Sequence, residues 1–156
     1  MALIAARPCP DATPNGHLQM MRWGKRRANQ ELIKTKATLV VCPVSLVAQW
    51  ERELVTKTSP PLSVYVYHGS NRTSDETVLA EFDVIVTAYT LVGNDLTEDV
   101  DRRGPLGRLK FHRIILDEAH TIKNERTIMA TSCCRLDATY RWCMTATPIQ
   151  NRIEEL

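Results

Sequence analysis

The sequence has 156 residues, with 20 basic and 18 acidic side chains and 44% hydrophobic residues. These proportions are typical of a globular domain and exclude a disordered or fibrous chain. A chain of this length forms one domain at most, and it can bury a core without disulfide staples. The formal net charge of +2 excludes the strongly basic character of a dedicated nucleic-acid binder, so any DNA contact has to be local.

The five cysteines favour a reducing compartment. They form no CxxC pair and lie mostly in apolar runs, which argues against both a zinc site and a secreted disulfide framework. No apolar stretch reaches the roughly 20 residues of a membrane span. Residues 1–6 are too few for a signal peptide and lack its basic leader. We therefore expect a soluble, intracellular protein with no membrane partner.

Short apolar runs rich in β-branched residues alternate with segments of helical spacing. This alternation predicts an α/β fold with a mostly parallel sheet. The runs predict strands at 38–42, 63–67, 84–87, 113–116 and 141–144. Because they are apolar throughout, we expect helices on both faces of the sheet.

The segment after the first strand, SLVAQWERELVTK, predicts an amphipathic helix with Ser45 as its N-cap. Trp50 in this helix is more typical of core packing than of a platform for base stacking. A second helix is expected from about 126 to 136, and a third from about Gln150.

Two polar segments that contain Gly and Pro, 8–36 and 93–108, predict loops. The first includes the basic run from Arg22 to Arg27. This run fits a solvated loop better than a nuclear signal or a DNA-contacting insertion.

The string RIILDEAHTIKN, at 113–124, is the most informative of the sequence. An apolar strand delivers Asp117 and Glu118 at its carboxyl end, where open α/β sheets place their ligands. Adjacent carboxylates suit phosphoryl transfer, because one can hold Mg²⁺ while the other orients or deprotonates the attacking water. The alternative is that they only cap the following helix. The preceding strand and His120 favour the phosphoryl-transfer interpretation.

Two further strings place polar side chains at strand ends. In MTATPIQN, at 144–151, the hydroxyls of Thr145 and Thr147 can join a network beside a carboxylate or a phosphate, although the Thr-Pro pair also suits a plain turn. In LVVCPVSLVAQWERE, at 39–53, a strand leads into a helix whose first amides and Ser45 hydroxyl can bind a DNA phosphate.

In this order, the strings resemble the first RecA-like lobe of the Swi/Snf family of DNA-dependent ATPases, helicase-like motors of superfamily 2. The match runs from about Ala37 to the last residue. VVCPVSLVAQWERE is similar to motif Ia, YHGSNR to the strand end that follows, FDVIVTAYTLV to the motif Ib region, RIILDEAHTIKN to motif II, and CMTATPIQNRIEEL to motif III. Five ordered matches are far more specific than any one of them.

The resemblance implies roles for single residues. Asp117 would bind the magnesium of Mg-ATP and Glu118 would activate water, with Thr145 and Thr147 beside the nucleotide. His120 and the two threonines would couple the nucleotide state to the DNA-facing surface, and Gln150 and Asn151 would complete motif III. The positions where the family contacts the sugar-phosphate backbone of double-stranded DNA are Pro43, Ser45, Gln49 and Thr87.

Two departures from the family pattern stand out. Ala146 lies between the threonines of motif III, where the family usually has Gly. No GxxxxGK[ST] phosphate loop occurs in the sequence, since the GK at 24–25 is followed by Arg26 in a polar segment. The resemblance assigns 1–36 to the end of the helix after the phosphate loop (MALIAARP) plus a basic loop insertion, and 37–156 to a partial ATP-binding lobe with motifs Ia, Ib, II and III.

We therefore expect part of an ATP-dependent DNA translocase of the chromatin-remodelling or DNA-repair type, located in the nucleus. It would be inactive alone, because the phosphate loop and the second RecA-like lobe are not in the sequence. The alternative is a non-enzymatic truncated module that contacts DNA or a partner without hydrolysis, and a small α/β binding protein with a fortuitous DEAH is a third. Without a neighbouring phosphate-loop strand, strand 141–144 should keep an unpaired edge unless 8–36 covers it, and poor solubility is expected.

Overall fold

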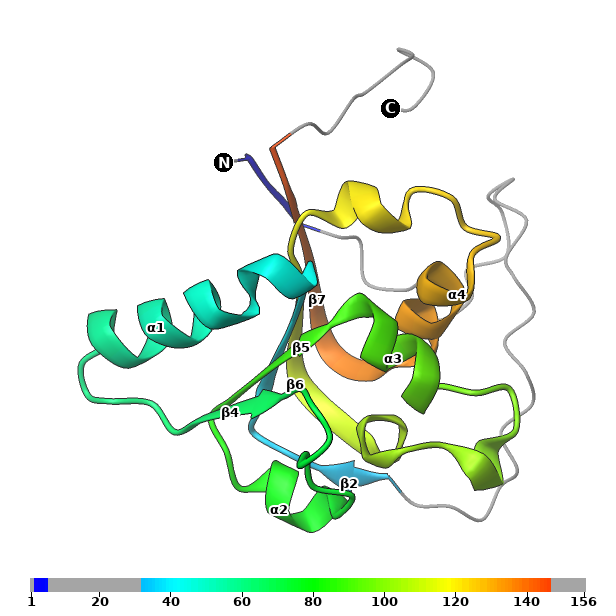
Figure 1. The fold of residues 1–156 in the computed structure, drawn as a ribbon, viewed down its shortest axis with the longest axis horizontal. Helices are drawn as coiled ribbons and strands as arrows, with labels where there is room; N and C mark the ends of the chain where they lie inside the picture. The colour runs from blue at the N-terminus through cyan, green and yellow to red at the C-terminus, as the bar shows by residue number, and fades with distance from the viewer. Residues whose placement is uncertain (1, 6–31, 147–156) are drawn as a thin grey trace.

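The computed structural model describes residues 2–5 and 32–146 of the chain (Figure 1). Its centre is a seven-stranded sheet of order β1-β7-β6-β3-β5-β4, in which β2 also pairs with β6. The strands are β1 (Ala2–Ala5), β2 (Ile33–Lys34), β3 (Thr38–Cys42), β4 (Val64–Tyr67), β5 (Val84–Ala88), β6 (Leu109–Leu116) and β7 (Asp137–Thr145). All pairings are parallel except that of β1 with β7. The predicted α/β class and mostly parallel sheet are confirmed.

Four α-helices and four short 3₁₀ helices connect the described strands. The α-helices are α1 (Val47–Lys57), α2 (Glu76–Ala80), α3 (Tyr89–Asp95) and α4 (Ile128–Arg135). The 3₁₀ helices are η1 (Val44–Leu46), η2 (Val100–Arg102), η3 (Pro105–Arg108) and η4 (Ala119–Ile122). No helix among the described residues is long and apolar enough to cross a membrane.

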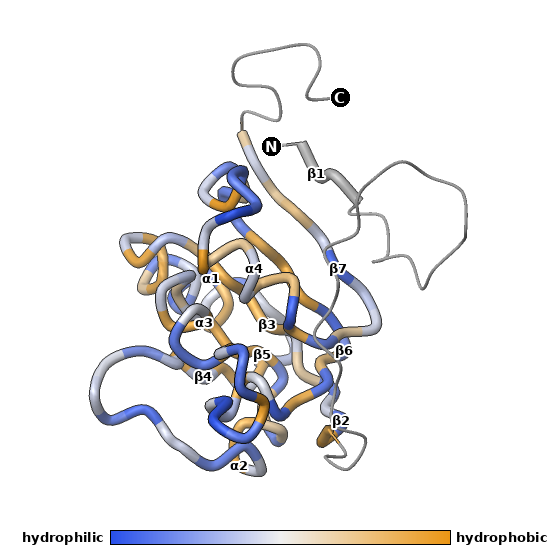
Figure 2. Tube along the Cα trace, turned by 90° about the vertical axis from the view of Figure 1, so that its right-hand side faces the viewer, coloured by the Kyte–Doolittle hydropathy of each residue, from blue (hydrophilic) through white to orange (hydrophobic). Residues whose placement is uncertain are grey.

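Helices cover both faces of the sheet, as predicted, and each face has its own core (Figure 1). Side chains of α1 pack on one face, against the smaller of two clusters of buried residues, called here the second cluster, which includes Val40 and Val86. Side chains of α2, α3 and α4 join the larger cluster on the other face, with Phe111 and Ile114. Hydrophobic residues concentrate along the central strands (Figure 2).

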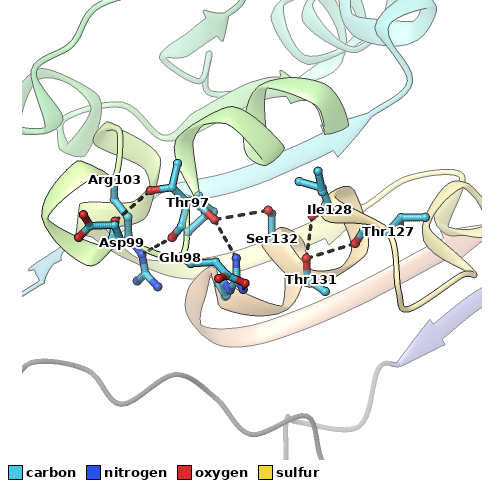
Figure 3. A network of polar contacts seen from close by, with 10 residues as sticks. Thr97, Glu98, Asp99, Arg103, Thr127, Ile128, Thr131 and Ser132 are labelled. Carbon is cyan, nitrogen blue, oxygen red and sulfur yellow. Dashed lines mark hydrogen bonds and ion pairs between the residues drawn. The ribbon is translucent and has the colours of Figure 1, made fainter.

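Helix α4 is tied to the segment that follows α3 (Figure 3). The buried Ser132 hydroxyl and the Arg135 guanidinium both donate to the carbonyl of Leu96, at 3.5 and 3.3 Å. Arg135 also pairs with Glu98 at 2.9 Å. These contacts hold together two elements that η2, η3, β6 and η4 separate in the sequence.

The start of the first long helix differs from the prediction. Pro43 begins a 3₁₀ turn, closed by a 2.9 Å hydrogen bond from the Leu46 amide to the Pro43 carbonyl, and α1 starts only at Val47. Ser45 lies inside this turn and is not the N-cap. The second predicted helix is α4, where Thr127 caps the helix by accepting a bond from the Ala130 amide at 3.2 Å.

The segment predicted as a loop at 93–108 contains the end of α3 and two 3₁₀ turns, η2 and η3. The other segment predicted as a loop, 8–36, contains the short strand β2, and its residues 8–31 lie outside the described part of the chain. The basic run at 22–27 and the helix predicted near Gln150 both lie outside the described residues.

The beginning of the chain also differs from the prediction. The resemblance implied a helix at MALIAARP, whereas Ala2–Ala5 forms β1, antiparallel to β7 with Ala2 opposite Thr145. A short apolar segment fits either a helix or a strand by its pattern, and a strand here satisfies backbone groups along β7. The edge expected to be unpaired is therefore paired, by β1.

Candidate functional site

The carboxyl ends of β3, β5 and β6 lie side by side, because these strands are parallel neighbours. The Asp117 amide donates to the Val41 carbonyl at 2.8 Å, which extends the hydrogen bonding one residue past the end of β6. The backbone at the acidic pair is thus fixed to the central strand β3. This is the edge at which a parallel sheet binds its ligands.

Both carboxylate oxygens of Asp117 accept a hydrogen bond. The Trp50 indole Nε1–H donates to Oδ2 at 2.8 Å, and the Glu118 amide donates to Oδ1 at 3.0 Å. The Tyr89 hydroxyl donates to the Asp117 backbone carbonyl at 2.7 Å. Sequence reasoning missed Trp50 and Tyr89 as partners of Asp117; the one available signal was that an inward Trp or Tyr needs an acceptor for its polar tip.

Glu118 has a left-handed backbone, with φ of 48° and ψ of 49°. This conformation costs a non-glycine residue free energy and is concentrated at functional sites. Glu118 precedes η4, but its side chain makes no capping hydrogen bond there, so the helix-cap alternative has no support in the geometry.

The predicted coupling residue His120 lies between Glu118 and Thr145, of which Thr145 was its expected partner. Its Nδ1 is 3.2 Å from Glu118 Oε2, which is enclosed, and 3.5 Å from the hydroxyl of the buried Thr145. The structure therefore brings Glu118, His120 and Thr145 together. Thr147, Gln150 and Asn151 lie outside the described residues.

The donor set of the edge suits Mg²⁺ but gives no complete metal cage. Among the described residues, no three His, Cys, Asp or Glu side chains are grouped as metal ligands. Mg²⁺ commonly binds through one or two carboxylates, several waters and substrate phosphates, so Asp117 fits it. The sequence contains no GxxxxGK[ST] loop. The backbone amides that bind those phosphates would therefore have to come from other residues.

Three of the four residues predicted to contact DNA lie where a ligand can reach them. Ser45 in η1 and Gln49 at the start of α1 are exposed, and Pro43, which precedes η1, is half-buried. The fourth, Thr87, has a side chain that is not accessible to a ligand in this structure. Thr87 is fully buried in β5, and its hydroxyl donates to the Tyr67 carbonyl at 3.0 Å.

A separate buried polar cluster is centred on Asp95. The Asp95 carboxylate accepts hydrogen bonds from the Tyr67 hydroxyl at 2.9 Å and from the Leu106 amide at 3.2 Å. Burial raises the pKa of Asp95 above its usual range, and the bonds from Tyr67 and Leu106 oppose that shift. The cluster joins β4, α3 and η3.

Residues 15–156 match the family model described as the SNF2-related domain. The chain is 39% identical to "Helicase-like transcription factor CHR27" of Arabidopsis thaliana, over 94% of this chain and 18% of that protein. It is 36% identical to "DNA repair protein RAD5B" of the same plant, over 100% of this chain and 13% of that protein. The fold is similar to "Sulfolobus solfataricus SWI2/SNF2 ATPase core in complex with dsDNA", with a TM-score of 0.62 and 32% identity over 78% of this chain and 23% of that one. The chain thus spans less than a quarter of each of these proteins.

Proposed function

This chain belongs to the SNF2-related domain family, and we propose that it is part of the ATP-dependent motor of a DNA translocase of the chromatin-remodelling or DNA-repair type. The observation that carries the proposal is the acidic pair Asp117 and Glu118 at the carboxyl edge of the sheet, next to the exposed start of α1. Relatives named as a helicase-like transcription factor and a repair protein support it, as does an ATPase core solved with double-stranded DNA. We also propose a nuclear location.

The residues of the edge divide the work of ATP hydrolysis. Asp117 would hold the magnesium of Mg-ATP, which when bound neutralises charge on the phosphates. Glu118 orients the attacking water and accepts its proton at the carboxylate. The Nδ1 of His120 lies between Glu118 and Thr145. Through these two contacts His120 would couple a change at the Glu118 carboxylate to Thr145, at the end of β7.

In this proposal the chain supplies only half of a nucleotide site. A phosphate loop holds the β- and γ-phosphates with backbone amides and a lysine, and the sequence contains no GxxxxGK[ST] that could do so. The second RecA-like lobe would supply the arginine finger. We therefore expect no measurable ATP turnover from the isolated 156-residue chain.

The proposed DNA surface consists of Pro43, Ser45 and Gln49. Such a surface contacts the sugar-phosphate backbone and does not read bases, so binding is independent of sequence and falls steeply with salt. The non-enzymatic module stays as the second candidate, because this exposed surface does not depend on a phosphate loop.

A duplex titration with the isolated chain tests the DNA part of the proposal. Wild-type chain should bind a labelled duplex weakly, with equal affinity for unrelated sequences, and lose affinity between about 50 and 200 mM salt. Gln49→Ala should weaken binding, while Thr56→Ala, an exposed residue near the far end of α1, should not. Tight, sequence-selective binding would favour a recognition module and contradict the translocase proposal.

ATP hydrolysis, measured beside that titration, separates the two candidates. A longer polypeptide that contains these residues together with a phosphate loop and a second lobe should hydrolyse ATP in a DNA-stimulated manner. DNA binding in that polypeptide without any hydrolysis would favour the non-enzymatic module.

A further inference from the structure

The indole of Trp50 contacts the carboxylate that is proposed to hold magnesium. Trp50 lies on the inner face of α1, half-buried against the second cluster of core residues, and its Nε1–H is 2.8 Å from Asp117 Oδ2. The two residues are 67 positions apart in the sequence. Leu54, one helical turn further along α1, packs against the same cluster with an apolar side chain.

The contact fixes the orientation of the carboxylate and leaves some of its lone-pair positions free. A carboxylate has about four lone-pair positions, and Trp50 and the Glu118 amide each occupy one, on different oxygens. Oxygen positions therefore stay available for a cation. A hydrogen bond to an ionised acceptor is stronger than one between neutral groups, so the indole is an effective restraint.

We infer that Trp50 is a positioning residue for the metal-binding carboxylate of Asp117. The inference rests on the proposed function, in which Asp117 holds Mg²⁺. Mg²⁺ demands a near-ideal octahedral arrangement, so a carboxylate held in one orientation binds it better than a rotating one. The helix that carries the proposed DNA-contacting Gln49 thereby also orients the metal ligand.

A purely packing role for Trp50 makes a different prediction. If Trp50 only fills space, Trp50→Phe and Leu54→Val are comparable changes within one cluster, and neither alters metal binding. If Trp50 orients Asp117, Trp50→Phe removes the donor but keeps an aromatic ring in place, and metal binding weakens. Leu54→Val is therefore the matched control.

The first measurement is NMR on the ¹⁵N-labelled 156-residue chain. The Trp50 indole N–H resonance is the one missing from the Trp50→Phe spectrum. It should move on Asp117→Asn, because a charged acceptor becomes neutral, and it should stay in place on Leu54→Val. An indole resonance that does not move on Asp117→Asn would overturn the inference.

The second measurement uses a polypeptide that contains this chain with a phosphate loop and a second lobe. It is the affinity of that polypeptide for Mn-ATP, with Mn²⁺ as a paramagnetic substitute for Mg²⁺, from electron paramagnetic resonance of the protein-bound ion. Trp50→Phe should weaken binding by about 10-fold, the lower end of what loss of an outer-shell partner costs. Leu54→Val should bind like the wild type.

The outcomes separate the inference from the function on which it rests. Wild-type affinity in Trp50→Phe would overturn the positioning role and leave the metal site intact. Equal Mn-ATP affinity of Asp117→Asn and the wild type would overturn the metal role of Asp117 in the proposed function, and the positioning role with it.

Discussion

The hydroxyl of Tyr89 donates a 2.7 Å hydrogen bond to the backbone carbonyl of Asp117. Tyr89 is the first residue of α3, directly after β5, and only 3% of its surface is exposed. Burial raises the pKa of Tyr89 well above its usual value, so the hydroxyl stays a neutral donor. A core side chain from a neighbouring strand end thus holds the backbone at the acidic pair.

Tyr89→Phe should lower the free energy of unfolding by about 1 kcal/mol, because it removes one internal hydrogen bond and leaves a carbonyl without its donor. Urea unfolding followed by circular dichroism measures the change. Tyr140→Phe is the control, because Tyr140 is 53% exposed. Equal stability of the two variants would mean that the bond to Asp117 contributes nothing.

The buried Asp95 carboxylate should make stability depend on pH. Its folded-state pKa is raised above 3.8 by burial, so its contribution to stability is present at low pH and is lost as pH rises through the folded-state pKa. Tyr67→Phe removes a hydrogen bond that lowers this pKa, and should raise it further. Carbon-detected NMR titration of Asp95 checks both shifts; a lower pKa in Tyr67→Phe would contradict this assignment.

Gly104→Ala should destabilise the fold by about 1–3 kcal/mol, the usual cost of overpacking, because the added Cβ would overlap the buried Asp95 side chain. A Cβ at Gly104 would lie 2.4 Å from Cγ of Asp95, whereas a Cβ at Gly93 would be 3.7 Å from the nearest neighbouring atom. Gly93→Ala, within α3, should instead gain about 0.5–1 kcal/mol from helix propensity. Thermal melts of the two variants should therefore move in opposite directions.

Glu118→Gly should raise the free energy of unfolding of the chain. Glu118 has the only positive φ among the non-glycine residues that the structure describes. Relief of roughly 1–2 kcal/mol of left-handed strain outweighs the backbone entropy of a glycine. The control Glu125→Gly lies in an exposed turn and should not stabilise. A destabilised Glu118→Gly would show that the side chain of Glu118 contributes more than its backbone costs.

Much of the sheet could be predicted from the sequence, because buried parallel strands are continuous apolar runs. The strand expected at 38–42 has the bounds of β3. The apolar run before Asp117 placed this residue at the end of a strand, and parallel sheets bind their ligands at that end. Side-chain contacts across elements could not be predicted in this way. The bond from Trp50 to Asp117 and the burial of Thr87 depend on how α1, β4 and β5 pack against one another.

The start of the chain shows the limit of the pattern itself. Four apolar residues fit a helix or a strand equally well, and the free edge of β7, which is distant in the sequence, decides between them. The same holds for Ser45, because Pro43 sets up a 3₁₀ turn that delays the start of α1.

The most direct test of the central claim separates metal binding from water activation at the acidic pair. It uses a polypeptide that contains this chain with a phosphate loop and a second lobe, and measures Mg-ATP affinity beside DNA-stimulated phosphate release. Glu118→Gln should bind Mg-ATP like the wild type and release no phosphate, whereas Asp117→Asn should bind Mg-ATP more weakly and also be inactive. Near-normal DNA-stimulated hydrolysis by both variants would contradict the assignment of this edge as the nucleotide site.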